Sequence, residues 1–175
     1  MSHGHDKGHA PHAQHRAAAP VSVAAAVVTC SDSRTVETDQ TGASLRAALE
    51  GAGHAVVLHR VVRDDVAEIR TALEAALAAG ARAVVVNGGT GVSPRDVAVE
   101  ALRPLFDKEL PGFGELFRAL SFEQVGPAAW LSRATAGTCR GAVVFALPGS
   151  PRAVGLAMAR LILPELGHVV RELSR

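Results

Sequence analysis

The segment from Ala83 to Asp96 most constrains what this chain can fold into. It opens with three consecutive valines at 84–86, a pattern typical of a strand buried on both faces of a parallel sheet. The glycines that follow can bring backbone N–H groups close to a phosphate or another anion. Asp96 comes shortly after them, where we expect a helix to begin. This order predicts a ligand site at the carboxyl end of an α/β sheet, although the same glycines would also suit a tight strand-to-helix connection.

Composition narrows the class of protein. The chain has 175 residues, enough for one domain with its own core. Hydrophobic residues make up 48% of it, mostly Ala, Val and Leu, whereas aromatic residues make up only 3%. This favours helices packed on a Val-rich sheet and argues against the exposed rings that bind single-stranded nucleic acid. The formal net charge is +1 without a basic stripe, so we expect no nucleic-acid partner.

Cysteine usage and hydropathy bear on location and metal binding. Cys30 and Cys139 lie far apart in the sequence and neither belongs to a C-x-x-C pair, so buried free thiols are expected rather than a zinc site. We find no apolar run of membrane-span length and no secretory signal pattern. The sequence therefore predicts a cytoplasmic protein without a membrane partner.

The chain divides into two parts of different character. Residues 1–20 are rich in histidine, glycine, alanine and proline and show no apolar periodicity, so we predict a disordered tail there. Clustered imidazoles can chelate transition metals, but an incidental polar leader is the favoured interpretation. Residues 21–175 are predicted to form a single domain.

Within that domain, strands and helices alternate with short links. This alternation predicts an α/β three-layer sandwich with a mainly parallel sheet. Residues 121–140 show no clear pattern, and Pro164 is expected to kink or split the last helix. The predicted strands are Val21–Thr29, Ala55–Val62, Ala83–Asn87 and Ala142–Leu147, and the predicted helices are Thr41–Ala52, a helix capped by Asp64–Asp65 that ends at Gly80, Asp96–Leu102, Gly112–Leu120 and the segment after Pro151.

Polar and glycine residues follow the ends of the predicted strands. Because parallel strands place their carboxyl ends at one edge of the sheet, these residues are candidates for a single site. The strand at 142–147 is followed by a second anion cradle before a helix N-terminus. The candidate binding residues are Ser31, Asp32, Gly88, Gly89, Thr90, Gly91, Pro148, Gly149 and Ser150. For Ser31 and Asp32 an ordinary polar turn is an equally good account.

Two carboxylates suggest a cation. Asp64 and Asp96 would repel a phosphate unless a cation lies between them, and Mg²⁺ typically uses one or two carboxylates plus substrate phosphates. We therefore predict that Asp64 and Asp96 bind Mg²⁺. The alternative is that both residues cap helices, a role compatible with metal binding.

Seven segments, in order along the chain, resemble the MoaB/Mog family of molybdenum cofactor biosynthesis. The resemblance runs from about Val23 to Leu166. It is closer to the MoaB branch, because Arg63 stands where the Mog branch places a proline before the first acid. The segments are Thr29–Arg34, Asp39–Gly42, Gly88–Gly91 with Arg95–Asp96, Pro111–Arg118, Ser121–Glu123, Leu131–Arg133 and Leu147–Pro151.

The resemblance implies a molybdopterin-binding fold, a homotrimer or hexamer, and catalysis. The implied reaction is adenylylation of molybdopterin by Mg-ATP, which gives adenylylated molybdopterin and pyrophosphate, with Asp64 and Asp96 as the catalytic acids. Glu100, one turn after Asp96 on the same face of the predicted helix, could bind the pterin amide and exocyclic amine. Ala98–Val99 stand where the family usually carries Thr-Pro, which keeps open a non-catalytic pterin carrier or a structural subunit that contacts other cofactor-biosynthesis proteins. Arg118, Ser121, Ser132 and Arg133 could meet pterin or phosphate. An equally good account is that Glu115, Arg118 and Glu123 form surface or subunit-interface ion pairs.

Overall fold

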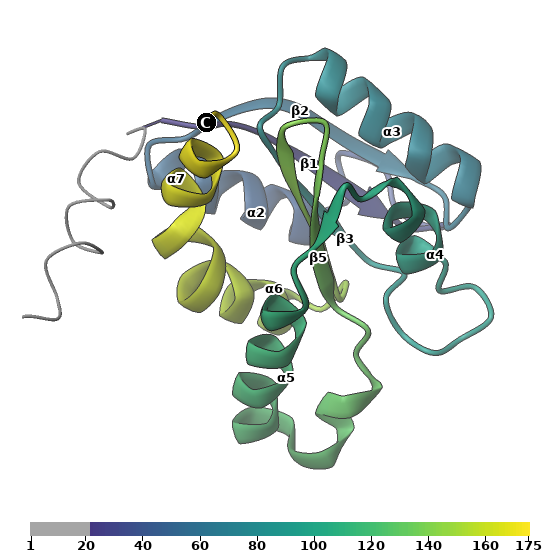
Figure 1. Ribbon diagram of the computed structural model, residues 1–175. Coiled ribbons are helices and arrows are strands. Elements are labelled where there is room, and N and C mark those ends of the chain that lie inside the picture. The colour runs from purple at the N-terminus through teal and green to yellow at the C-terminus, as the bar shows by residue number, and fades with distance from the viewer. Residues whose placement is uncertain (1–21) are drawn as a thin grey trace, which may run out of the picture.

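The computed structural model describes residues 22–175, and the predicted tail lies outside them (Figure 1). Within this range six strands form one sheet in the order β2-β1-β3-β6-β5-β4. The first four are mutually parallel, and β5 runs antiparallel to both β6 and β4. The mainly parallel sheet is therefore confirmed. The strands are β1 (Ala24–Cys30), β2 (Ala55–Val62), β3 (Ala83–Asn87), β4 (Lys108–Glu109), β5 (Thr135–Cys139) and β6 (Ala142–Leu147).

Helices cover both faces of the sheet, which confirms the three layers. Side chains alternate across each strand, so Val85 packs into the core on one face and Val84 and Val86 into the core on the other. In Figure 1, α3 and α4 lie on one side of the strands and α6 and α7 on the other. The helices are α2 (Gln40–Gly51), α3 (Val66–Ala78), α4 (Ala98–Leu102), α5 (Pro111–Val125), α6 (Pro151–Ala157) and α7 (Leu163–Glu172), with 3₁₀ segments η1 (Arg103–Leu105) and η2 (Gly126–Leu131) and a π-helical segment η3 (Met158–Ile162).

Three predicted strands, β2, β3 and β6, have the expected bounds. Other predicted bounds were wrong. Strand β1 is Ala24–Cys30 rather than Val21–Thr29, the helix after the glycine loop begins at Ala98 rather than Asp96, and α5 extends to Val125. Both β4 and β5 were missed. The middle residue of β5 is Gly137, and a Cβ there would lie 2.2 Å from the Phe106 ring. Because this packing requires a glycine, β5 lacks the continuous β-branched pattern that would have predicted a strand.

The C-terminal helix is not split at Pro164, but its hydrogen-bonding pattern changes from α to π and back. Residues 151–172 form one helical stretch in which a π-helical segment precedes Pro164, whose nitrogen cannot donate a hydrogen bond. This stretch is also long and apolar enough to meet the length and composition of a membrane span, so the expectation of no such run was wrong. Its residues Val154, Met158 and Ile162 are buried in the core beside the sheet.

A buried polar cluster joins β1, β2, β3 and the start of α2. The Asp39 carboxylate, which caps α2, accepts hydrogen bonds from the Thr29 hydroxyl at 2.5 Å and from the Gly42 N–H at 2.9 Å. His59 Nε2 lies 3.1 Å from the same carboxylate, and Asn87 Nδ2 donates to the Thr29 hydroxyl at 2.8 Å. Burial alone would raise the pKa of Asp39, but these hydrogen bonds outweigh it and lower the pKa below its ordinary value.

We predict that Asp39→Ala lowers the free energy of unfolding by about 2–4 kcal/mol, because it removes a helix cap and leaves buried donors unpaired. The expected fall in Tm is roughly 5–15 °C. The lowered pKa means that this stabilisation is present at neutral pH and is lost as the pH falls through the folded-state pKa of Asp39.

The matched control is Arg46→Ala, which removes an exposed ion pair with Glu50 on the same helix and should change Tm little. Equal Tm values for the two variants would contradict the proposed importance of the Asp39 cluster.

Candidate ligand site at the carboxyl ends of the strands

The loops after β1, β2, β3 and β6 meet at one edge of the sheet. Strand register places Thr29 opposite Asn87, and Asn87 opposite Leu147, so these strands end at the same level. The chain runs from β1 to β2 on one side and then crosses to β3 on the other side of β1. This is the topological switch point at which open α/β sheets bind ligands.

The glycine loop has the backbone that the sequence suggested. Gly88 and Gly89 have φ values of 96° and 65°, a region that strains other residues. A Cβ on Gly88 would lie 2.3 Å from the Cys30 carbonyl oxygen, and one on Gly149 would lie 3.4 Å from Gly88 Cα. The two predicted anion cradles are thus adjacent. The Gly88 N–H, however, donates to the Leu147 carbonyl at 2.9 Å, which leaves the N–H groups of Gly89 to Gly91 as the donors for an anion.

The second cradle is tied to the start of α2. The Thr41 hydroxyl donates to the Gly149 carbonyl at 3.3 Å. The Ser150 hydroxyl caps α6 by accepting from the Ala153 N–H at 3.1 Å. Pro148 precedes these two residues in the same turn. Anion binding at Pro148, Gly149 and Ser150 remains a prediction, and capping already accounts for the Ser150 hydroxyl.

Three carboxylates approach one another beside the glycine loop. The Asp64 N–H donates to Asp32 Oδ1 at 3.3 Å, and the Arg95 guanidinium pairs with the other Asp32 oxygen. Burial raises the pKa of Asp64, and the charges of Asp32 and Asp96 raise it further, whereas Arg95 acts in the opposite direction. Asp64 Oδ1 is buried and has no hydrogen-bond partner within residues 22–175, and it lies 3.0 Å from where a Gly89 Cβ would be.

Helix capping does not explain either of the predicted catalytic acids. Asp65, not Asp64, caps α3, with Oδ1 accepting from the N–H groups of Ala67 and Glu68 at 2.9 Å each. Asp96 Oδ2 accepts from the Ser93 N–H at 2.8 Å within the loop, and α4 begins two residues later without a side-chain cap. The capping interpretation of Asp64 and Asp96 was wrong.

Ser31, in the loop after β1, and Thr90, in the glycine loop, have contacts that stabilise the loops themselves. The Ser31 hydroxyl accepts from the Ser33 N–H at 3.4 Å, as in an ordinary polar turn. The Ser31 N–H donates to the Val62 carbonyl at 2.8 Å, which ties this loop to the end of β2. Thr90 is buried, and its carbonyl accepts from the Arg133 N–H at 3.0 Å.

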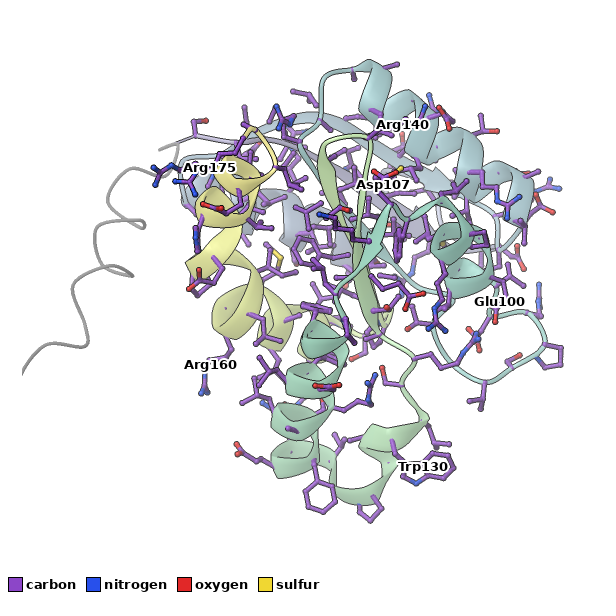
Figure 2. All side chains as sticks on the ribbon, in the orientation of Figure 1. Glu100, Asp107, Trp130, Arg140, Arg160 and Arg175 are labelled. Atoms are coloured by element: carbon purple, nitrogen blue, oxygen red, sulfur yellow. The ribbon has the colours of Figure 1, made fainter. Side chains whose placement is uncertain are left out.

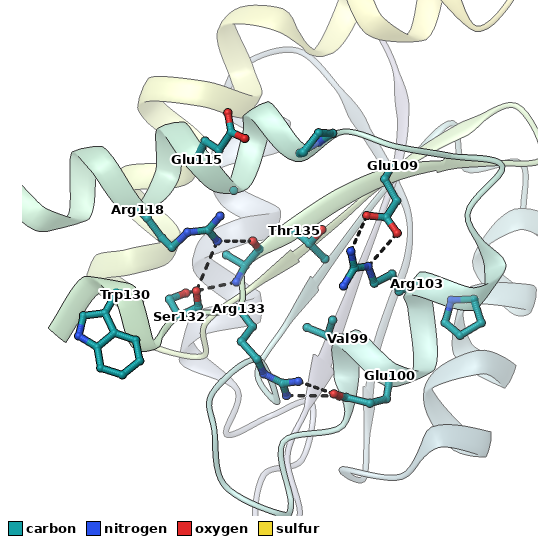
Figure 3. A pocket seen from close by; sticks show the side chains of 14 residues that line it. Val99, Glu100, Arg103, Glu109, Glu115, Arg118, Trp130, Ser132, Arg133 and Thr135 are labelled. Carbon is teal, nitrogen blue, oxygen red and sulfur yellow. Dashed lines mark hydrogen bonds and ion pairs between the residues drawn. The ribbon is translucent and has the colours of Figure 1, made fainter. Parts of the chain in front are cut away.

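Glu100 lies apart from the three aspartates, on the wall of a neighbouring cavity of about 690 Å³ between α4, α5 and η2 (Figure 3). The prediction that Asp96 and Glu100 share one face of the same helix was wrong, because Asp96 precedes the helix. Both Glu100 oxygens face the Arg133 guanidinium, which lowers the pKa of Glu100 chiefly through hydrogen bonding. Asp64, Asp96 and the glycines do not line this cavity.

Arg118 of α5 and Arg133 of the region without a clear sequence pattern have structural partners that sequence reasoning missed. Arg118 Nη1 donates to the carbonyls of Ser132 and Ala134 at 3.4 and 3.2 Å. Arg133 donates to the carbonyls of Gly91 and Asp96, each at 2.7 Å. No sequence pattern could have shown this, because the acceptors are backbone atoms supplied by a distant segment.

The aspartates provide oxygen ligands suited to a hard divalent cation, but they do not provide a complete set of ligands. Among the described residues, no group of three or more His, Cys, Asp or Glu side chains is arranged to hold a metal ion. The unpartnered oxygen of Asp64 beside Asp32 and Asp96 is nevertheless the donor chemistry that Mg²⁺ prefers, and Mg²⁺ takes most of its other ligands from water and phosphates. The residues present therefore suit a magnesium ion that arrives with a phosphate-bearing ligand.

The fold defines an open α/β protein in which two glycine-containing loops and three aspartates meet at the switch point of the sheet. Residues 26–168 match the family described as a probable molybdopterin binding domain. The chain therefore belongs to the MoaB/Mog family, which confirms the resemblance.

Relatives cover nearly the whole chain. It is 50% identical over 164 residues to molybdenum cofactor biosynthesis protein B of Halalkalibacterium halodurans, across 93% of this chain and 96% of that protein. It is 49% identical over 168 residues to the protein of the same name from Bacillus subtilis, with the same two coverages of 93% and 96%. The crystal structure of the tungsten cofactor synthesizing protein MoaB from Pyrococcus furiosus matches with a TM-score of 0.82 at 41% identity, over 90% of this chain and 100% of that one. These relatives support a role in molybdenum cofactor biosynthesis.

We predict that Asp64→Asn stabilises the protein without divalent cations at neutral pH. The raised pKa of Asp64 means that its ionised form is disfavoured in the folded state, so removal of the charge relieves a cost. The expected rise in Tm is small, roughly 1–3 °C. It should vanish at a pH low enough to protonate Asp64 in both the folded and the unfolded chain.

The neighbouring residue supplies the control. Asp65→Ala removes the cap of α3 and should lower the free energy of unfolding by about 1 kcal/mol. A lower Tm for Asp64→Asn than for the unaltered protein would contradict the description of Asp64 as an electrostatically strained carboxylate.

Proposed function

We propose that this protein is a molybdopterin adenylyltransferase that uses Mg-ATP. The observation that carries the proposal is the buried, unpartnered oxygen of Asp64 beside Asp32, Asp96 and the glycine loop. In the proposed reaction an oxygen of the molybdopterin phosphate attacks the α-phosphorus of ATP. A new P–O bond forms, the bond between the α- and β-phosphates breaks, and pyrophosphate leaves with its electron pair. Family membership supports this assignment.

This chemistry requires positioning and charge neutralisation more than a protein nucleophile. The N–H groups of Gly89 to Gly91 can hold phosphate oxygens without a competing side chain. The turn at 148–150 lies close enough to Gly88 to contact a second phosphate of the same reactant pair. A bound Mg²⁺ would neutralise charge between the carboxylates and the phosphates. Asp64 and Asp96 are the residues proposed to hold it.

Cys30 is not proposed as a nucleophile, although it ends the strand that leads into the site. Burial raises the pKa of its thiol to about 12, and the charge of Asp64 adds to the shift. The thiol therefore stays protonated at neutral pH, whereas the thiolate is the reactive form. This confirms the expectation of a buried free thiol.

A pterin carrier without turnover is the second candidate. The observation that favours it is the departure at Ala98, where the family usually carries a hydroxyl. Ala98 is buried, its N–H donates to the Gly89 carbonyl at 3.0 Å, and its methyl group packs beside Gly89. A smaller apolar residue therefore supports the glycine loop here, with no hydroxyl at that position to contact a substrate. Pterin retention without pyrophosphate release would identify the carrier. If the protein neither retained pterin nor released pyrophosphate, a structural subunit would be favoured.

We predict that Asp96→Asn lowers kcat for pyrophosphate release from ATP, with molybdopterin and Mg²⁺ present, by roughly 10²-fold, since it removes charge at the metal position. The variant should keep its Tm and oligomeric state. Glu74→Gln alters a distant, exposed ion pair and should leave the rate unchanged. An unaltered rate in Asp96→Asn would rule out the metal role of Asp96.

We also propose that the protein is a homo-oligomer, a trimer or a hexamer. Figure 2 shows Trp130 at the outer end of the projection that α5 and η2 form. Trp130, Phe122 and Leu116 on these elements are 72, 59 and 57% exposed. Large apolar side chains gathered on one projection are typical of a subunit contact.

The double substitution Phe122→Glu and Trp130→Glu should shift the sedimentation coefficient toward that of a monomer, because it places charge in the proposed contact. Val57→Lys, at an exposed apolar position on β2, is the control and should leave sedimentation unchanged. Monomeric behaviour of the unaltered protein at micromolar concentration would contradict the proposed assembly.

A further inference from the structure

We propose that Arg133 is a positioning residue that holds the loop between Gly91 and Asp96 in its ligand-binding shape, and that Glu100 acts through Arg133. The residue comes from the segment between η2 and β5, which is remote in sequence from the loop. The effect of Arg133 on the shape of the loop follows from the structure alone, whereas its effect on adenylyl transfer rests on the proposed function.

The guanidinium joins both ends of the loop. Nε donates to the Gly91 carbonyl and Nη2 to the Asp96 carbonyl, each at 2.7 Å. The Arg133 N–H adds a bond to the Thr90 carbonyl at 3.0 Å. One side chain therefore fixes the backbone on both sides of the turn that carries Asp96. Charged donors to carbonyl oxygens form stronger hydrogen bonds than neutral donors.

Glu100 completes this arrangement from the first turn of α4. Figure 3 shows the Arg133 guanidinium directed at the Glu100 carboxylate, with interactions to both carboxylate oxygens. The pair fixes the guanidinium plane, so that the Nε–H and one N–H of Nη2 point at the carbonyls of Gly91 and Asp96. Arginine is suited to this role because its planar donors have a fixed geometry, whereas lysine offers a single rotating ammonium group.

This arrangement engages four of the five guanidinium N–H groups of Arg133, so a phosphate could pair with most of the guanidinium only by displacing a backbone carbonyl or Glu100. Both Glu100 oxygens already accept from Arg133, although the Glu100 side chain is 52% exposed. Loss of either contact would free the loop that holds Asp96. The Gly91 backbone packs closely against Asp96, since a Cβ on Gly91 would lie 2.8 Å from Asp96 Oδ2, and this packing would be lost as well. The geometry thus favours a structural role for both residues at the edge of the site.

Hydrogen–deuterium exchange of the unliganded full-length protein tests the inference. Arg133→Gln should speed amide exchange within 90–97 by roughly tenfold or more, as expected when hydrogen bonds that hold a loop are lost. Arg133→Lys should have nearly the same effect, although it keeps the charge. Glu100→Gln should speed exchange in the same segment by a smaller factor, and the double variant should match Arg133→Gln, because the two residues act as one unit.

Arg103→Gln is the matched control. Arg103 lines the same cavity and forms an ion pair with Glu109 through two 2.8 Å hydrogen bonds, but it does not contact the loop. Its substitution should leave exchange at 90–97 unchanged. Circular dichroism should show that all variants stay folded at the temperature of the measurement.

Catalysis gives a second, separate readout. In the adenylylation assay, Arg133→Gln and Glu100→Gln should lower kcat and leave KM for molybdopterin nearly unchanged. Unchanged loop exchange in Arg133→Gln would overturn the positioning role. A raised KM for molybdopterin in Glu100→Gln, with unchanged exchange, would assign Glu100 to the substrate instead. If the unaltered protein released no pyrophosphate, the proposed function would fail while the exchange result still decided the role of Arg133.

Discussion

The close approach of β1, β3 and β6 at their carboxyl ends is the constraint on which the rest of the structure depends. The Cys30 carbonyl occupies the position where a side chain of residue 88 would begin, and the turn after β6 lies against Gly88 from the other direction. A residue with a Cβ at this position would force the strands or the loops apart. Because glycine stands there, two loops and three carboxylates can share one small region.

That closeness has an electrostatic cost, which is why the region is best understood as a functional site. Burial and the charges of Asp32 and Asp96 disfavour the ionised form of Asp64, and the Arg95 guanidinium, which pairs with Asp32, acts in the opposite direction. The buried Asp39 carboxylate shows the contrast, since its hydrogen bonds stabilise the charged form. A protein under selection for stability alone would satisfy Asp64 in the same way. An oxygen kept without a partner is the arrangement expected where a cation and a phosphate bind.

Prediction from sequence succeeded where local pattern and burial agreed. Strands β2, β3 and β6, each of which carries consecutive valines, have the predicted bounds, and the glycine loop and the cap at Asp65 were also placed correctly. It failed at β5, where packing of the Phe106 ring demands a glycine and hides the strand pattern. It also misplaced the start of α4, because Asp96 looks like a helix cap but bonds within its own loop.

The sequence by itself determined the class of fold, the family, and the identity of the residues that gather at the sheet edge. These follow from local properties: alternation of apolar residues, glycines at positive φ, and acids after strands. Only the tertiary structure decided that Asp64 Oδ1 has no hydrogen-bond partner among residues 22–175, that Asp39 and His59 share a buried cluster, and that Arg133 joins the two ends of the loop. The physical reason is that each depends on contacts between segments tens of residues apart, with backbone carbonyls or buried charges as partners, and such partners leave no signature in the order of residues along one chain.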